Sequence, residues 1–386
     1  MFNSIIKIFS LGKLYYKSKN NTKSVLIFDH ATSNLLENYL DKDEIDYFYS
    51  RREKFEIGVF FSTLFQKGFK DFGKRYFLNF LKKYKPKYLI SLWFVNSLIY
   101  EVKKNFPEIK IIIIQSHIFS KPNFDYIKKF DSSSIDYIYV WRNYEKNIFQ
   151  KFFHKSKIIV IGSIKNNHFY KYKEKLIKKF LYFSEYKVSR ISYNEETTLS
   201  ILDEFCKNHK IKFDIQIRYK KISNENNKFL KSKNFQSLDK VLTKEDQGTP
   251  YKNSNYYEFL VLNSSSLVDE FLANLKKVAV IESFDNFDEK VYFDINKGKT
   301  TDDFTSNPMF KETNANYFWT TNIDKLKVDK VLSNLIYSTK EQYDTEIKKY
   351  DSKVFYNQNN QILKESLSKI GLPVLLDKKL IQKNDN

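Results

Sequence analysis

The chain has 386 residues, well beyond the ~150 residues of a single domain, so we expect two domains. With 42% hydrophobic, 17% aromatic and 29% charged residues, its composition is globular and excludes disordered and fibrous proteins. The single cysteine, Cys206, cannot form an internal disulfide bond, which fits a reducing compartment.

The net charge of +20 suggests a negatively charged partner, but the type of basic residue argues against nucleic acid. Only six of the 66 basic residues are arginine, and the lysines are scattered along the whole chain. Proteins that recognise phosphates and bases rely on arginine, whose planar group donates two parallel hydrogen bonds. We therefore expect no specific nucleic acid partner. A solvated lysine surface is the simpler interpretation, and attraction to an anionic membrane is the alternative.

The sequence contains no apolar run of the ~20 residues that a membrane-spanning helix needs. The first twenty residues mix apolar side chains with lysine but lack the apolar core and small-residue cleavage site of a signal peptide. We expect a cytoplasmic protein that is at most peripheral to the inner membrane.

The first half of the chain alternates short apolar runs, typical of buried strands, with longer segments of helical periodicity. The expected strands are residues 24–28, 46–49, 88–93, 110–115, 136–141 and 157–161. The expected helices are residues 33–40, 60–84, 96–105 and 143–153. This alternation predicts a parallel sheet with helices on both faces.

A polar, basic stretch at residues 164–175 is typical of a linker, and a second alternation follows it. Its expected strands are residues 188–192, 212–217, 258–262 and 277–281, and its expected helices are residues 195–208 and 266–274. Residues 224–257 are weakly patterned, and residues 323–370 are helical in pattern. We therefore predict two doubly wound Rossmann-like domains, at residues 1–165 and 166–355, followed by a C-terminal helix and frayed tail at 356–386.

Motifs with strongly diagnostic spacing are absent from the sequence. It contains no G-x-G-x-x-G, no P-loop, no G-x-S-x-G and no Cys/His cluster for zinc. Asp41-Lys42-Asp43 fits the D-x-D metal-binding pair but lies in a charged turn. We expect neither a metal-dependent mechanism nor a cofactor.

The most informative segment is the strand predicted at 258–262, which runs directly into Ser264, Ser265 and Ser266 at the start of a helix. The free N–H groups at a helix start favour anions, so a phosphate-bearing ligand would fit there. Glu270, one turn later, could hold a ribose diol. The alternative is an ordinary helix cap with Glu270 facing solvent.

Arg218 and Lys220 come at the carboxyl end of the strand predicted at 212–217. Ligands bind at this end of the strands in open α/β sheets, and arginine is rare in this chain. We interpret the pair as a phosphate-binding group, with a surface ion pair as the alternative.

In the first domain, Asp29, His30 and His117 follow predicted strands and are expected at one edge of the sheet. A neutral imidazole can accept a proton near neutral pH, so His117 is the leading candidate for a base, and Asp29 and His30 are comparable ones. A purely structural histidine is the alternative.

Several stretches resemble bacterial surface-carbohydrate biosynthesis proteins with the GT-B glycosyltransferase fold. The run from Ser264 to Val278 is similar to the donor-side signature S-S-x-x-x-E-x-x-x-x-x-K-x-V. The other similar stretches are residues 25–33, 85–91, 113–117, 160–167 and 315–319, and their order spans residues 24 to 370. The chain departs from the expected Gln-Asn-Gly or Gln-His-Gly at Gln115-Ser116-His117.

The resemblance implies two Rossmann-like domains facing a central cleft. It implies metal-independent transfer of a sugar from a nucleotide-activated donor to a surface glycan or a lipid-linked acceptor. CMP-Kdo, CDP-glycerol and nucleoside-diphosphate sugars all remain open as donors. Arg218, Lys220 and the three serines would bind the donor phosphates, and Glu270 the ribose. The alternatives are a basic binding protein at a membrane or on RNA and an inactive GT-B relative.

Overall fold

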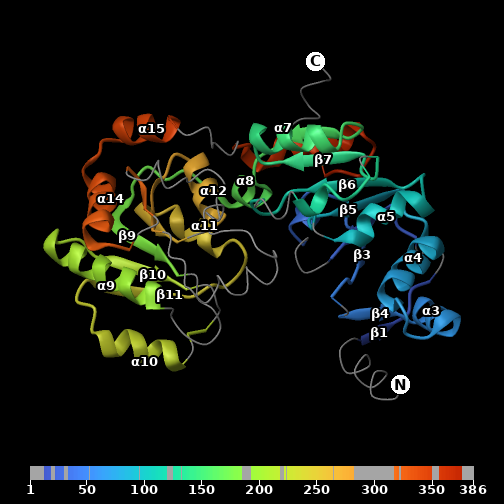
Figure 1. Ribbon diagram of the computed structural model, residues 1–386, viewed down its shortest axis with the longest axis horizontal. Coiled ribbons are helices and arrows are strands. Elements are labelled where there is room, and N and C mark those ends of the chain that lie inside the picture. Colours follow the sequence, from blue (N-terminus) through green and yellow to red (C-terminus); the bar gives the residue numbers. More distant parts are fainter. Residues whose placement is uncertain are drawn as a thin grey trace. The chain divides into compact units, whose positions relative to one another are not determined.

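The computed structural model describes residues 13–18, 22–29, 34–51, 53–94, 96–119, 125–131, 133–184, 193–217, 221–222, 224–263, 265–281, 317–320, 323–349 and 356–375. The chain forms two compact units (Figure 1). Unit 1 comprises Met1–Ser116, Asp125–Ile161 and Asn357–Asn386, and unit 2 comprises His117–Phe124 and Gly162–Tyr356.

The core of unit 1 is a six-stranded sheet in which all neighbouring strands are parallel. In sheet order, its strands are β3 (Ile45–Phe48), β2 (Val25–Phe28), β5 (Tyr88–Ser91), β6 (Lys110–Ile114), β7 (Tyr137–Val140) and β8 (Lys157–Val160). Runs such as VLIF in β2 have no polar alternation, because side chains on both faces are buried. Each of these strands was predicted from the sequence to within a few residues.

Helices pack around this sheet, and a small parallel pair, β1 (Lys13–Tyr15) and β4 (Lys54–Glu56), lies beside it. The helices of unit 1 are η1 (Asn34–Asn38), α3 (Ile57–Lys67), α4 (Phe72–Tyr84), α5 (Ser97–Asn105), α7 (Asn143–Phe152), η4 (Gln358–Asn360) and α16 (Gln361–Lys369). The single helix predicted at 60–84 is two helices. Gly68, with φ of 58°, ends α3 by donating its N–H to the Leu64 carbonyl.

The segment that contains η4 and α16 returns to unit 1. The Tyr88 hydroxyl donates to the Ile370 carbonyl at 2.7 Å. The Asn360 amide donates to the Tyr39 hydroxyl at 2.7 Å, and Leu40 forms an isolated antiparallel bridge with Val374. Unit 1 is therefore built from segments before and after unit 2 in the sequence.

Unit 2 also contains a six-stranded parallel sheet. In sheet order, its strands are β11 (Leu238–Leu242), β10 (Phe213–Gln216), β9 (Ile177–Phe183), β12 (Tyr257–Leu262), β13 (Lys277–Ile281) and β14 (Trp319–Thr320). Along the chain, β9, β10 and β11 extend the sheet in one direction, and β12, β13 and β14 then extend it in the other. This is the doubly wound order, with its switch point between β9 and β12.

The helices of unit 2 are α8 (Ile164–Phe169), α9 (Tyr193–Asn208), α10 (Asn224–Lys233), α11 (Thr249–Ser254), α12 (Leu267–Ala273), α14 (Lys325–Tyr337) and α15 (Lys340–Lys348). Two sequence predictions were wrong here. The linker expected at 164–175 contains α8, and the weakly patterned stretch at 224–257 contains α10, β11 and α11. The central strand β9 was not predicted, and the strand expected at 188–192 lies outside the described residues.

The predicted α/β class with two parallel, doubly wound sheets is confirmed. Among the residues that the structure describes, no helix has the length and apolar character needed to cross a membrane.

The outer edge of β13 is completed by a side chain. β14 pairs with β13 only at Val280 and Ile281, which leaves the backbone of Val278 without a strand partner on that side. The buried Tyr343 hydroxyl of α15 accepts from the Val278 N–H at 2.7 Å and donates to the Val278 carbonyl at 2.6 Å. One phenol thereby replaces a missing strand residue.

We predict that Tyr343→Phe lowers the free energy of unfolding of unit 2 by about 2–4 kcal/mol, because it leaves two buried backbone groups without a partner. Denaturant unfolding measures the loss. The matched control is Tyr337→Phe, because Tyr337 is 69% exposed and its hydroxyl bonds only at the surface. The control should change stability by about 0.5 kcal/mol or less. Equal losses in the two variants would contradict this role for Tyr343.

Candidate active site

The switch point of the unit 2 sheet is flanked by the polar turn that follows β12. Asn263 is buried, and the backbone carbonyl of Ser265 accepts from the Val268 N–H at 3.0 Å. The Ser265 hydroxyl accepts from the Leu267 N–H at 3.3 Å, whereas Ser266, the first residue before α12, makes no side-chain cap. The predicted serine cap is therefore made by Ser265. Ser264 lies outside the described residues.

Glu270, on the first turn of α12, is the most distinctive group at this end of the sheet. Its side chain is 1% exposed, so the alternative of a solvent-facing Glu270 is wrong. The Ser163 hydroxyl donates to Oε1 in a short hydrogen bond, and the Tyr251 hydroxyl donates to Oε2 at 2.9 Å. A buried carboxylate needs such donors, since leaving it without them would cost several kcal/mol.

Ser163 reaches Glu270 because of the turn that precedes α8. Gly162 has φ of 75°, a conformation that favours glycine, and it directs the chain into α8 with Ser163 as the N-cap. The Ser163 hydroxyl accepts from the Asn166 N–H at 3.4 Å while it donates to Glu270. One turn further, Asn166 and Asn274 exchange amide hydrogen bonds of 3.3 and 2.6 Å, so α8 and α12 are joined at two points.

Tyr251 enters from α11 and is held by aromatic packing. Its ring stacks on Phe169 with centroids 5.8 Å apart and meets Phe271 edge-on at 6.1 Å. Burial and the neighbouring Glu270 raise the pKa of Tyr251 well above 10, so its hydroxyl stays protonated and serves as a donor. Three short helices thus converge on one carboxyl group.

The electrostatics of the site give Glu270 a pKa near neutrality. Burial raises the pKa of Glu270 from 4.5 to about 7, and Asp269 adds to the rise. The hydrogen bond from Ser163, the charge of Lys165 and the hydrogen bond from Tyr251 oppose the rise. Such a group can hold or release a proton at physiological pH.

His117 lies in the same electrostatic neighbourhood. Although it follows β6, its contacts group it with unit 2, and its ring lies 5.5 Å from that of Phe119. Burial and then the charge of Lys165 lower the pKa of His117 below 6.5, so the imidazole is neutral at pH 7. The same Lys165 ammonium lowers the pKa of Glu270, and it therefore links these two predicted site residues.

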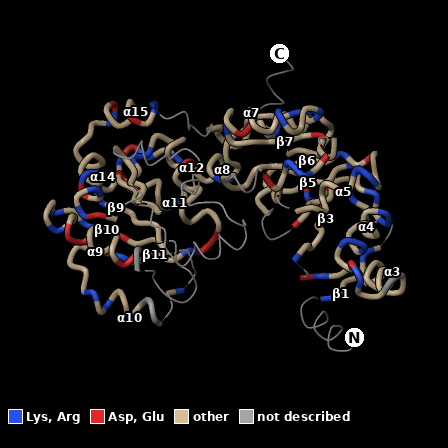
Figure 2. The backbone as a smooth tube through the Cα atoms, in the orientation of Figure 1, with Lys and Arg blue, Asp and Glu red and all other residues tan. Residues whose placement is uncertain are grey.

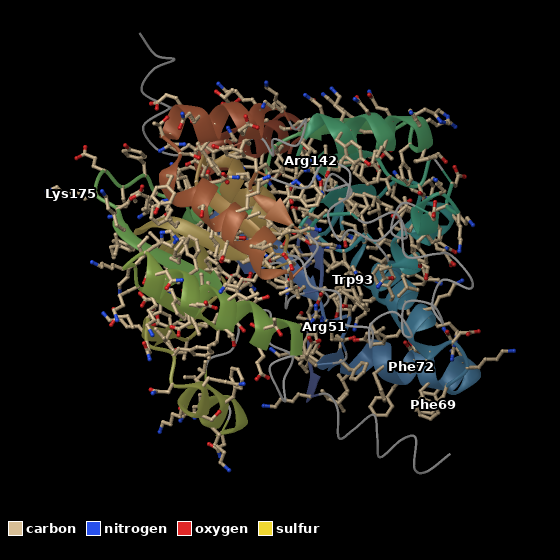
Figure 3. All side chains as sticks on the ribbon, turned by 60° about the vertical axis from the view of Figure 1, so that its left-hand side comes forward. Arg51, Phe69, Phe72, Trp93, Arg142 and Lys175 are labelled. Atoms are coloured by element: carbon tan, nitrogen blue, oxygen red, sulfur yellow. The ribbon has the colours of Figure 1, made fainter. Side chains whose placement is uncertain are left out.

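Asp29 directly follows β2, which flanks the switch point of the unit 1 sheet. Its carboxylate forms an ion pair with Arg51. It is 1% exposed and accepts from Arg51 Nε at 3.2 Å and Nη2 at 3.0 Å. The Arg51 side chain is half exposed. Figure 3 labels Arg51 and also Trp93, which lies just after β5. A carboxylate engaged in this way is better suited to orienting Arg51 than to removing a proton.

Three further site predictions, His30, Arg218 and Lys220, lie outside the described residues. Within the described part of the chain, no cluster of three or more His, Cys, Asp or Glu side chains could hold a metal ion. Sequence reasoning did not assign roles to Ser163, Lys165 and Tyr251. The Gly162-Ser163 pair after a strand was a usable signal, whereas nothing local marks Tyr251.

The comparisons with known proteins agree with this architecture. Residues 190–370, slightly less than half of the chain, match a family model described as "putative O-antigen biosynthesis protein". No curated protein matches the sequence at a significant level.

The solved structures that resemble this chain include three that cover most of its length. The UDP-GlcNAc 2-epimerase from Methanocaldococcus jannaschii is 12% identical, with a TM-score of 0.51, and the match covers 89% of this chain and 99% of that one. The UDP-GlcNAc 2-epimerase from Neisseria meningitidis, bound to UDP-GlcNAc, is 11% identical, with a TM-score of 0.51 and coverage of 93% and 100%. The wall teichoic acid polymerase TagF is 12% identical, with a TM-score of 0.51 and coverage of 92% and 90%.

The fold is GT-B-like. The predicted resemblance to surface-carbohydrate biosynthesis proteins is confirmed by the family model. At these identities the solved structures establish the fold of the chain and leave its reaction to be argued from its own residues.

The buried Glu270 carboxyl should make unit 2 less stable as the pH rises. Between pH 4.5 and about 7 the folded chain holds a proton that the unfolded chain has released. Rising pH therefore favours unfolding across this window. We predict that Glu270→Gln, which cannot ionise, gains about 3 kcal/mol relative to the unmodified protein between pH 4.5 and pH 8.

Denaturant unfolding at the two pH values tests this prediction. The control is Glu365→Gln on α16, where the carboxylate is exposed and the variant should follow the unmodified protein at both pH values. If the stability difference produced by Glu270→Gln is independent of pH, Glu270 ionises like an ordinary surface carboxyl.

Proposed function

We propose that this protein is a metal-independent glycosyltransferase of surface polysaccharide biosynthesis. It would move a sugar from a nucleotide-activated donor to a surface glycan or a lipid-linked acceptor at the cytoplasmic side of the inner membrane. The supporting observation is the cluster of Glu270, Ser163, Tyr251 and Lys165 in unit 2. Glu270 lies in the first turn of α12, the helix that follows β12, and β12 flanks the switch point where doubly wound sheets bind nucleotides.

The donor phosphates would lie among positive charges. Lys165 supplies one ammonium group, and Arg218 and Lys220 are sequence-based candidates for two more. Fixed cations and backbone N–H groups can stabilise charge on a departing nucleoside diphosphate without a metal ion. Ser264, Ser265 and Ser266 would donate hydrogen bonds to the phosphates. Glu270, held by Ser163 and Tyr251, would use its remaining lone pairs to accept from the ribose hydroxyls.

His117 would act on the acceptor. Its lowered pKa keeps the imidazole neutral at pH 7, and a neutral imidazole can accept the proton of an attacking hydroxyl. The role of Asp29 would be indirect, through its ion pair with Arg51. His30 stays a sequence-based candidate for the base.

A nucleotide-sugar epimerase is the second candidate. Two structures of UDP-GlcNAc 2-epimerases match this chain over nearly their full length. Glu270, with a pKa of about 7, and His117, whose pKa is lowered by burial, could both exchange protons. Incubation with UDP-GlcNAc, followed by NMR of the products, separates the two reactions. An epimerase changes the sugar configuration without an acceptor, whereas a transferase needs one.

A thermal-shift screen against UMP, UDP, GDP, CMP and CDP tests nucleotide binding directly. A ligand at a hundred times its Kd stabilises the folded state by about 2.7 kcal/mol, which is readily measured. We expect one base to stabilise the protein selectively. No shift with any of the five, together with no turnover, would favour the binding-protein or inactive-relative alternative.

We predict that Arg218→Ala weakens nucleotide affinity by about ten- to a hundredfold, because a charge-assisted contact contributes about 1.5–3 kcal/mol. Arg218→Lys should restore part of the affinity, since it keeps the charge but loses the planar two-point contact. Calorimetric titration with the nucleotide found in the screen measures both variants. Unchanged affinity in Arg218→Ala would remove this residue from the donor site.

We predict that His117→Ala keeps nucleotide affinity and slows transfer by about a hundredfold or more, because it removes the base and not a phosphate contact. Turnover with a saturating donor, measured beside a nucleotide titration, separates the two effects. If His117→Ala instead loses nucleotide binding while turnover per bound donor is unchanged, His117 belongs to the donor site and is not the base.

A further inference from the structure

Helix α3 of unit 1 carries exposed aromatic side chains and no acidic residue. Its sequence, IGVFFSTLFQK, contains no acidic residue and a single basic one at its end. Phe65 is 83% exposed and Phe61 is 38% exposed, and their rings stack with centroids 6.3 Å apart. Large exposed rings in adjacent turns are unusual on a free surface and indicate a partner.

These rings are held on a rigid support. Phe61 contacts Phe60 edge-on at 5.5 Å, and Phe60 contacts Phe72 of α4 at 5.3 Å. Phe69, in the turn between the helices, lies 5.9 Å from Phe72, and Figure 3 shows both at the end of this hairpin. The exposed pair is therefore continuous with a buried aromatic core.

One arginine fixes the turn between the two helices. Arg75 of α4 donates to the carbonyls of Thr63 at 2.7 Å, Gly68 at 2.6 Å and Lys70 at 2.9 Å. These bonds tie α4 to the C-terminal part of α3, at Thr63, and to the turn that follows it, at Gly68 and Lys70. The exposed rings thus face outward from an ordered hairpin, and presenting them to a partner costs little conformational entropy.

The charge around these rings is positive. Residues 54–85 contain eight Lys and Arg side chains against two acidic ones. One of the acids, Glu56, is fully buried as the N-cap of α3 and is paired with Lys83 at 3.0 Å. Lys70 and Lys82 are exposed. Figure 2 shows the basic residues along α4 beside the largely uncharged α3.

The size of the aromatic surface decides between two kinds of partner. A stable protein interface buries about 800 Å² on each side, whereas two phenylalanine rings bury about 300–500 Å² at most. Shallow insertion of a few aromatic rings beside lysines is sufficient at the headgroup level of an anionic bilayer. The small apolar area with its basic border therefore fits a lipid surface better than a second protein.

We propose that the α3–α4 hairpin docks this protein on an anionic phospholipid bilayer, with Phe61 and Phe65 inserted among the headgroups and Lys70 and Lys82 beside the lipid phosphates. This inference gives a defined surface to the peripheral membrane contact that the sequence analysis left open. It does not depend on the transfer reaction, because no residue of the hairpin belongs to the candidate active site.

Vesicle co-flotation of the full-length protein tests the proposal. Vesicles of phosphatidylcholine with phosphatidylglycerol should retain the protein, and vesicles of phosphatidylcholine alone should retain much less. The double variant Phe61→Ser, Phe65→Ser should bind the anionic vesicles about ten- to a hundredfold more weakly. The matched control is Tyr172→Ser in unit 2, which removes a 77% exposed ring and should bind like the unmodified protein.

A second pair of variants tests the charge. Lys70→Glu with Lys82→Glu should reduce binding to anionic vesicles and make the remaining binding less sensitive to salt, because fewer lysine–phosphate attractions are left to screen, without changing thermal unfolding of the protein. Equal binding by the Phe61, Phe65 variant and the unmodified protein would overturn the proposal. So would light scattering that shows a dimer dissociated by the same two substitutions, because the rings would then bind a second copy. Nucleotide binding should be unchanged in all these variants, which separates this test from that of the active site.

Discussion

The hydrogen bonds from Ser163 and Tyr251 to the buried carboxyl of Glu270 are the constraint on which the organisation of unit 2 depends. A carboxyl group without solvent contact must be supplied with donors, and here the donors come from two other helices. Because each donor sits on a short helix, the position of one side chain fixes how α8, α11 and α12 approach one another. Misplacing any of these helices would leave a buried charge unsatisfied, which is far more costly than a small packing defect.

This arrangement explains how short helices can form a defined site. Helices of six or seven residues have little stability of their own, since helix initiation is unfavourable. Their geometry must come from tertiary contacts. The amide pair of Asn166 and Asn274 and the stacking of Tyr251 on Phe169 supply those contacts around the carboxyl group. The polar centre fixes how the helices approach one another, and the aromatic stacking holds Tyr251 in place.

Much of the fold could be predicted from the sequence, because strands buried on both faces appear as uninterrupted apolar runs. Strand β9 shows why one strand was missed. Its second and third residues are Lys178 and Lys179, which locally resemble linker residues. In the structure, the Lys179 ammonium lies 3.3 Å from the Asp214 carboxylate on β10 and also pairs with Asp239 on β11. The compensating charges are 35 and 60 residues away, beyond the reach of any local pattern.

The site was partly predictable for the same reason. The serine-rich turn after β12 and the position of Glu270 follow from local sequence. The burial of Glu270 does not, because its partners lie 107 residues before it, at Ser163, and 19 residues before it, at Tyr251. Asp29 illustrates the opposite case. Its position at a strand end was predicted, whereas its engagement by Arg51 depends on where the chain emerges from the neighbouring strand β3.

The return of residues 357–375 to unit 1 has a consequence for synthesis on the ribosome. Unit 2 is contained in one nearly continuous stretch, so its sheet can assemble as soon as that stretch has emerged. All six strands of the unit 1 sheet have been synthesised by residue 160. Ile370 and Val374, whose backbones bond to Tyr88 and Leu40, are synthesised some two hundred residues later. During that interval Tyr39, Leu40 and Tyr88 form a nascent surface without its native cover, a state in which chaperone capture competes with aggregation. The order of translation thus makes α16 the closing element of the first unit to be synthesised.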